Sequence, residues 1–181
     1  MARVGFVLAI IGGAFWMSLP FYPPECVPVT GDSEVFCNRL WSPAFAAMLI
    51  GAIALYGFLR RDGSGRVIPG FRPMIIGFAL MTAGNVGEYW LAFHLPHQGG
   101  LGGIVRGLLW MAVLAGWLTA LVGSFIAGAE LLRSKRRDRH IGWLFLLGFP
   151  LTFVLAITVG PNLAPLPIGL LGVVVGIYGL T

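Results

Sequence analysis

Charged side chains are scarce in this sequence. Aspartate, glutamate, lysine and arginine together make up 10% of the residues, whereas they make up about a quarter of a typical soluble globular protein. Apolar residues make up 57%, and the mean hydropathy is +0.87. This composition excludes an ordinary soluble globular domain and indicates a chain whose main solvent is lipid.

The sequence also lacks the motifs of common enzyme classes. It contains no G-x-S-x-G nucleophile elbow, no H-E-x-x-H zinc motif and no G-x-G-x-x-G dinucleotide fingerprint. No polar segment is long enough to bury a core of its own. These absences argue against an enzyme, although they do not exclude one, and we expect neither a cofactor nor a bound metal.

Long apolar stretches fill most of the chain instead. Each is close to the roughly 20 residues that an α-helix needs to cross a bilayer. They cover residues 4–21, 43–59, 73–93, 106–132, 141–159 and 167–180. The sequence therefore predicts an all-α fold, a polytopic six-transmembrane-helix bundle that forms one integral membrane domain over residues 1–181.

The first apolar stretch begins as a secretory signal does, directly after the basic start Met1-Ala2-Arg3. It has no clear small-x-small cleavage site before Pro23-Pro24. We expect a retained helix, with a cleaved signal peptide as the alternative.

Ten of the twelve lysines and arginines concentrate in three places, and two apolar stretches separate each place from the next. They are Arg3; Arg60, Arg61, Arg66 and Arg72; and Arg133, Lys135, Arg136, Arg137 and Arg139. Basic flanks of membrane helices stay on the cytoplasmic side. We therefore predict a multi-pass protein of the cell membrane with both termini cytoplasmic and residues 22–42 in an extracytoplasmic loop.

The formal net charge of +5 does not by itself indicate a nucleic-acid partner. The basic residues lie beside apolar stretches, at the level of anionic lipid headgroups. Membrane lipids are the expected partners, and no nucleic acid is expected.

Cysteine is rare, and Cys26 and Cys37 are the only two. Both fall in the loop that the charge pattern assigns to the outside, where thiols are oxidised. Their spacing does not match a C-x-x-C redox motif. The prediction is a structural disulfide that stiffens this loop.

One ionisable residue, Glu88, lies well inside an apolar stretch. It follows Pro73 by about 22 Å at 1.5 Å per residue, which places it in the outer third of the membrane. Asn85 and Tyr89 share its helical face. Glu88 could carry a proton, ligate a cation or hold a polar substrate group; alternatively, it pairs with Arg106 and joins two helices.

His94 and His97 follow Glu88 at the predicted outer boundary. Neutral imidazole is a common metal ligand, but Pro96 interrupts helical presentation and no third ligand is evident. We interpret them as interfacial histidines. Trp16, Trp41, Trp90 and Trp143 lie near the predicted helix ends, as an aromatic belt requires.

Small residues recur every fourth position in the stretch 106–132, at Gly116, Ala120, Ser124 and Gly128. Another helix can approach closely along such a stripe. The partner is either a helix of the same chain, which we favour, or a second subunit in a homo-oligomer or membrane-protein complex.

These observations favour a non-catalytic integral membrane protein that binds a lipid, an apolar small molecule or a membrane partner subunit. One alternative is a proton- or cation-coupled small-solute transporter or channel that uses Glu88, although the inner half offers few polar residues to continue a path. The other is an enzyme that modifies lipids of the outer leaflet with Glu88, Tyr89, His94 and His97.

Overall fold

The computed structural model describes residues 2–18, 21, 32–61, 68–96, 99–133, 139–159 and 166–180. These residues form six α-helices and one π-helical turn, with no strand among them, which confirms the all-α prediction for the described part of the chain. The elements are α1 (Ala2–Ser18), α2 (Asp32–Arg61), α3 (Phe71–Val86), the π-helix η3 (Gly87–Leu91), α4 (Gly100–Arg133), α5 (Arg139–Thr158) and α6 (Leu166–Leu180).

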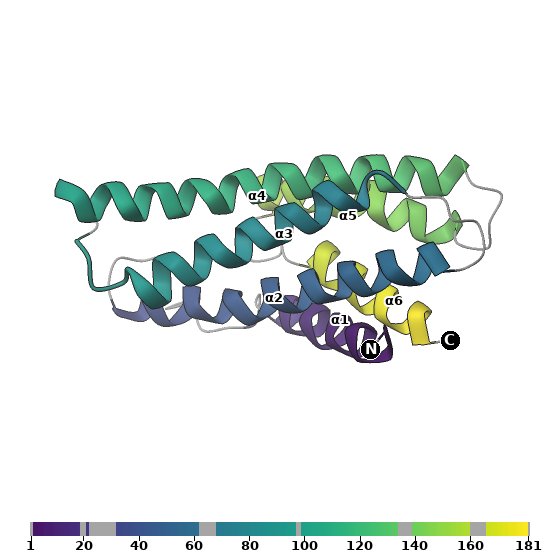
Figure 1. Ribbon diagram of the computed structural model, residues 1–181, viewed down its shortest axis with the longest axis horizontal. Coiled ribbons are helices and arrows are strands. Elements are labelled where there is room, and N and C mark those ends of the chain that lie inside the picture. Colours follow the sequence, from purple (N-terminus) through teal and green to yellow (C-terminus); the bar gives the residue numbers. More distant parts are fainter. Residues whose placement is uncertain are drawn as a thin grey trace.

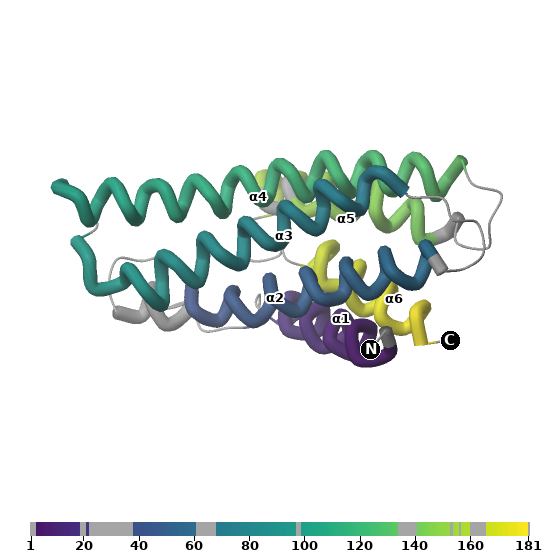
Figure 2. The backbone as a smooth tube through the Cα atoms, viewed as in Figure 1, coloured from purple at the N-terminus to yellow at the C-terminus, as the bar shows by residue number. Residues whose placement is uncertain are grey.

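The six helices form a closed ring. Each helix packs against the next one along the chain, and α6 packs back against α1 (Figure 1). The most extensive contacts join α3 to α4 and α1 to α6, so two tightly packed pairs are connected by α2 and α5. Figure 2 shows α1 and α6 side by side, with both chain termini at the same end of the bundle.

Glycine allows the backbones of α3 and α4 to touch. A Cβ atom added at Gly77 would lie 2.5 Å from the amide nitrogen of Ala120, and one added at Gly116 would lie 2.6 Å from the carbonyl oxygen of Gly77. The pair α1 and α6 is equally close, since a Cβ at Gly169 would lie 2.6 Å from the carbonyl oxygen of Gly13. Small residues at these crossings permit the close contact.

The small-residue stripe of α4 is occupied inside the chain. Gly116 and Ala120 face α3, while a Cβ at Gly128 would lie 2.8 Å from the carbonyl oxygen of Gly142 on α5. The hydroxyl of Ser124 donates a hydrogen bond to the carbonyl oxygen of Phe145, also on α5. Packing within the chain therefore accounts for all four residues, which are buried. A subunit interface built on them remains a prediction.

Two helices, α2 and α4, begin well before the starts that the sequence indicated. Helix α2 starts at Asp32, about three turns before the expected start at 43, so much of the segment 22–42 assigned to a loop is helical. Pro43 lies inside α2 rather than in its first turn. A proline in a helix interior removes one backbone hydrogen bond, and the packing of α2 against α1 and α3 maintains the helix through this position. Helix α4 likewise starts at Gly100, not at 106.

The cations of the described residues separate to the two ends of the ring. Arg3, Arg60, Arg72 and Arg133 are exposed. They belong to the starts of α1 and α3 and to the ends of α2 and α4, which lie with both termini at one end of the bundle, called here the basic end. Arg39 and Arg106 lie with Glu88 at the opposite end, called here the Glu88 end.

Two helical segments, Asn38–Arg60 and Gly100–Arg133, are long and apolar enough to span a membrane. The segments Arg3–Ser18, Ile141–Thr152 and Leu166–Leu180 are apolar but shorter. By length and composition, two helices are therefore candidate membrane spans, and six spans remain a prediction.

The glycine contacts generate a test. We expect Gly77→Ala to lower the free energy of unfolding by about 1 to 3 kcal/mol, because its methyl group meets the backbone of α4 and the two helices must move apart. Thermal unfolding in detergent measures this change. The matched control is Gly57→Ala in α2, where a Cβ meets nothing within 4 Å and stability should stay equal or rise by up to about 1 kcal/mol. Equal effects of the two substitutions would contradict the close α3–α4 contact.

Candidate functional site

A polar cluster occupies the Glu88 end of the ring, where α2, α3 and α4 come together. Asn85 of α3 is buried, and the hydroxyl of Ser42 on α2 donates a hydrogen bond to its Oδ1 at 2.5 Å. The same hydroxyl accepts a hydrogen bond from Nε1 of Trp90 at 3.0 Å. Ser42 therefore connects α2 to the last turn of α3 and to η3.

The π-helix explains how both positions reach Ser42. Asn85 and Trp90 are five residues apart, which places them well apart around an α-helix of 3.6 residues per turn. In the wider π-helical turn, hydrogen bonds join residues five apart, and the Ala92 amide indeed donates to the Gly87 carbonyl at 2.8 Å. The wider turn therefore brings the two side chains to the same neighbour.

Glu88 and Arg106 form an ion pair between η3 and α4. Arg106 Nη2 lies 3.9 Å from Glu88 Oε1, and the two residues are only 3% and 6% exposed, respectively. The sequence had left open whether Glu88 serves function or joins two helices, and this pairing is the geometry that the second alternative requires. Both ionised groups lose water on burial, so each depends on the other for compensation.

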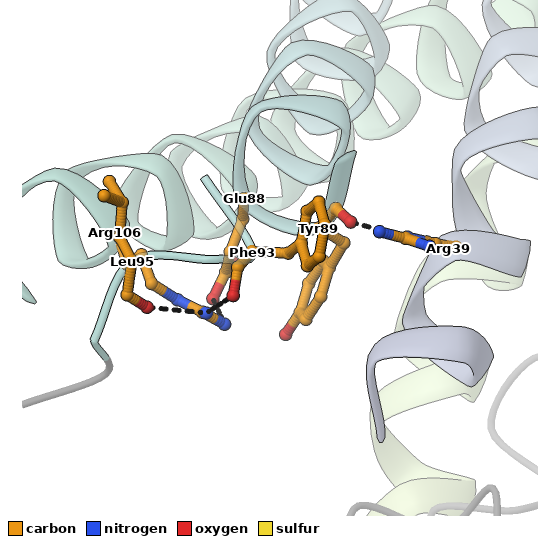
Figure 3. A network of polar contacts seen from close by, with 6 residues as sticks. All are labelled: Arg39, Glu88, Tyr89, Phe93, Leu95 and Arg106. Atoms are coloured by element: carbon orange, nitrogen blue, oxygen red, sulfur yellow. Dashed lines mark hydrogen bonds and ion pairs between the residues drawn. The ribbon is translucent and has the colours of Figure 1, made fainter. Parts of the chain in front are cut away.

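Arg106 is also held by the turn that follows η3. Its Nη1 donates to the carbonyl oxygens of Phe93 at 3.1 Å and Leu95 at 3.4 Å (Figure 3). Its guanidinium carbon lies 6.0 Å from the centre of the Tyr89 ring. Nε and Nη2 make no hydrogen bond with any described residue. One arginine thus fixes the carboxylate of Glu88 and two carbonyls of the chain reversal between α3 and α4.

Arg39 approaches the same segment from α2. Its Nε donates to the carbonyl oxygen of Tyr89 at 2.7 Å, and its guanidinium carbon lies 4.5 Å from the Phe93 ring centre and 5.2 Å from that of Trp90. Figure 3 shows Arg39 and Arg106 on opposite sides of this segment. The two cations together hold the end of α3 between α2 and α4.

The structure brings together only part of the predicted site. Asn85, Glu88, Tyr89 and Arg106 are buried in the cluster. His94 is exposed, and its ring packs edge to face on Phe93 with centroids 5.7 Å apart. His97, Cys26 and the side chain of Cys37 lie outside the described residues, so the disulfide remains a prediction. Within the described residues, no three His, Cys, Asp or Glu side chains gather as metal ligands do.

A second feature, an aromatic cluster, fills the centre of the ring. Trp16 of α1 contacts Trp41 and Phe45 of α2, with ring centroids 5.1 and 5.5 Å apart, and reaches across the ring to Trp117 of α4 at 6.0 Å. Trp117 packs on Phe149 of α5, which also contacts Phe78 of α3. Trp16 is 0% exposed, so its assignment to an interfacial aromatic belt was wrong, because the ring points into the bundle and not toward the bilayer surface.

An apolar cavity lies beside this cluster, toward the basic end. All the space between the atoms of the cavity, its open side included, amounts to about 310 Å³. The volume that the centre of a water-sized sphere can occupy is about 20 Å³. A single water needs roughly 10 to 15 Å³ on the latter measure. The lining comes from every helix except α4 and consists of Ala9, Met48, Gly51, Ala52, Leu55, Met74, Phe78, Phe145, Leu171, Gly172 and Val175.

Sequence reasoning missed several residues of both features. Ser42 and Arg39 were assigned to a loop, because Pro43 was taken as the start of the helix. Trp16 stood at the end of an apolar stretch, where a belt position is the ordinary interpretation. One signal was available in the sequence. Arg39 and Ser42 stand three residues apart just before the apolar stretch, so on a longer helix they would share one polar face.

The ion pair generates a test with a double-mutant cycle. We expect Glu88→Gln and Arg106→Met each to lower the free energy of unfolding by about 3 to 5 kcal/mol, because either change leaves the opposite buried charge uncompensated. The double variant should lose clearly less than the sum of the two. Unfolding in detergent provides the measurement, and Arg133→Met, at an exposed position, is the control with little change. Losses that simply add would contradict a direct pairing.

No protein-family model matches this chain, and neither a curated protein nor a solved structure matches it. The function proposed below therefore rests on the residues and contacts of this chain.

Proposed function

We propose that this protein is a non-catalytic integral membrane protein that binds the apolar end of a lipid or of another apolar molecule in the cavity inside its ring of helices. The observation that carries the proposal is the cavity itself, which has room for a small group and a lining without ionisable side chains. Apolar cavities of this kind exclude water and accept apolar ligands.

The surface of α4 supports placement in a membrane. Only 22% of its most apolar window is buried in the bundle, whereas a core helix of a soluble protein is mostly buried. Leu101, Leu108 and Leu118 are 77%, 65% and 60% exposed, and they belong to an apolar face that extends along the helix. Contiguous exposed apolar surface of this length requires an apolar solvent or partner.

The distribution of cations supports an orientation. The basic end carries both termini and the exposed arginines, and basic flanks remain in the cytoplasm. We assign the basic end to the cytoplasmic side of the cell membrane and the Glu88 end to the outer side. This orientation is the one that the six-span prediction requires, and α2 and α4 support it by their length and composition.

The surroundings of the cavity favour binding of the apolar end of a ligand over transport of a solute. Glu88 is matched by Arg106, so it lacks the freedom that a proton or cation carrier needs, and the residues that line the cavity carry no polar side chain that could continue a path for a solute. An outer-leaflet enzyme would need His94 to cooperate with Glu88, but His94 packs on Phe93 at the surface. Transport and catalysis are therefore the weaker candidates.

Filling the cavity tests the proposal. A photoreactive acyl chain with a diazirine at its terminal carbon, added to the protein in vesicles, should label residues that line the cavity. We expect Ala52→Leu to reduce this labelling several-fold, because Ala52 lines the cavity and is 7% exposed, so the larger side chain occupies the space. Mass spectrometry of the labelled peptides provides the measurement.

The matched control is Ala115→Leu, the same substitution at an exposed position of α4. It should leave labelling of the cavity residues unchanged. Leu171→Ala, which enlarges the cavity, should preserve or raise the labelling. Equal labelling in the wild type and Ala52→Leu would overturn the proposal, since the probe would then not occupy the cavity.

The orientation has its own test. In a background with Cys26→Ser and Cys37→Ser, a membrane-impermeant maleimide applied to intact cells should label His94→Cys, an exposed position at the Glu88 end. It should label Arg133→Cys, at the basic end, only after the membrane is permeabilised. The reverse pattern, or equal labelling of both in intact cells, would contradict the assigned orientation.

A further inference from the structure

Four neighbouring helices carry arginine at the basic end. Tyr56, near the end of α2, lies against Phe71 at the start of α3, with ring centroids 6.0 Å apart. A Cβ at Gly70, just before α3, would meet the backbone of Ala127 on α4, and a Cβ at Gly5, near the start of α1, would meet a side chain of α2. These helix ends therefore adjoin one another around the ring, and each carries an exposed arginine: Arg3 on α1, Arg60 on α2, Arg72 on α3 and Arg133 on α4.

Each of these arginines shares a helical face with a large apolar side chain that the bundle leaves exposed. Residues four or seven apart lie on the same face of an α-helix. The pairs, with the exposed fraction of the apolar partner, are Arg3 with Val7 (43%), Arg60 with Ile53 (50%), Arg72 with Ile76 (55%) and Arg133 with Ile126 (42%). The four cations therefore continue apolar stripes that face outward from the bundle.

The stripe on α2 has room for an acyl chain. Gly57 lies between Ile53 and Arg60 on the same face, and a Cβ added at Gly57 would meet no described atom within 4 Å. From Ile53 to Arg60 the stripe is about 10 Å long. A hydrocarbon chain can therefore lie against the backbone at Gly57, with Ile53 on one side and the guanidinium group of Arg60 at its end.

Positive charge dominates this end of the described structure. The acidic side chain that accompanies the four arginines there is Glu130, three residues before Arg133 on α4. An arginine side chain can follow an apolar surface with its stem and keep its guanidinium group at the level of the lipid headgroups. Guanidinium groups bind phosphate oxygens through charge-assisted hydrogen bonds, which are often bidentate. This surface therefore suits a molecule with an anionic head and an apolar tail.

We propose that the arginines of the basic end form a binding surface for anionic phospholipids, with the phosphates on the guanidinium groups and the acyl chains along the exposed apolar stripes. An acidic soluble protein fits less well, because it would cover the arginines and leave the adjoining stripes without an apolar partner. This inference rests on the membrane placement in the proposed function and is independent of the cavity. It adds a second lipid-binding surface and a lipid class.

Lipid selectivity in vesicles tests this surface. The protein is reconstituted in phosphatidylcholine vesicles with a trace of spin-labelled phosphatidylglycerol, or of spin-labelled phosphatidylcholine with the same acyl chains. Electron paramagnetic resonance measures the fraction of each label that contact with the protein immobilises. We expect the anionic label to associate about two- to fivefold more strongly than the zwitterionic label, because each basic residue near the membrane surface attracts anionic lipid by about this factor.

Two matched double variants assign the selectivity to these arginines. Arg60→Gln with Arg72→Gln should lower the association ratio by about twofold, whereas Arg60→Lys with Arg72→Lys keeps both charges and should preserve most of the ratio. Both positions are exposed, so thermal unfolding in detergent should be the same for the two variants. Equal association of the two labels with the wild type, or an unchanged ratio in the Gln variant, would overturn the proposal.

A comparison of salts separates a lipid surface from a site for a soluble anion. Inorganic phosphate and chloride at the same ionic strength should weaken the selectivity equally, because both act by screening. A stronger effect of phosphate would assign the arginines to a soluble anion and overturn the lipid surface. Loss of selectivity would leave the proposed cavity binding standing, whereas the absence of an immobilised component for either label would overturn the membrane placement and the proposed function with it.

Discussion

Close backbone contact between glycine-bearing helices is the constraint on which the rest of this structure depends. In the membrane that we propose for this protein, no hydrophobic effect would drive one helix against another, so van der Waals contact and hydrogen bonds would have to do so. The crossings of Gly77 with Gly116 and of Gly13 with Gly169 bring α3 onto α4 and α1 onto α6 without intervening side chains. These two pairs fix the ring, and the remaining helices, α2 and α5, close it.

The polar cluster follows from this packing. Because α3 lies directly on α4, the end of α3 brings Glu88 to Arg106, and the π-helical turn directs Asn85 and Trp90 to Ser42 on α2. The same packing leaves the centre of the ring to large aromatic side chains on one side and to a small apolar cavity on the other. The bundle thus combines a buried ion pair at one end with a small apolar cavity in its interior.

Comparison of sequence and structure shows which properties are local. The apolar stretch 73–93 predicted a helix that the structure realises as α3 and η3, and Arg106 was already named as a partner for Glu88 because a buried carboxylate needs a cation. The start of α2 was not predictable from Pro43, since proline marks a first turn more often than an interior. In the structure the helix continues through Pro43, and α2 packs along α1 and α3. Trp16 was misjudged for a similar reason, because a position near a helix end does not reveal which way the ring points.

The sequence by itself determined the helical class, the apolar character of the chain and the separation of basic residues from Glu88, because each of these depends on composition and spacing along one segment. The tertiary structure decided which neighbour each face meets. It set the ion pair of Glu88, the shared hydroxyl of Ser42, the burial of the small-residue stripe of α4 and the burial of Trp16 among the rings of α2 and α4. The reason is that these depend on how each helix is rotated and which helix lies beside it, and that is fixed by contacts between segments far apart in the chain.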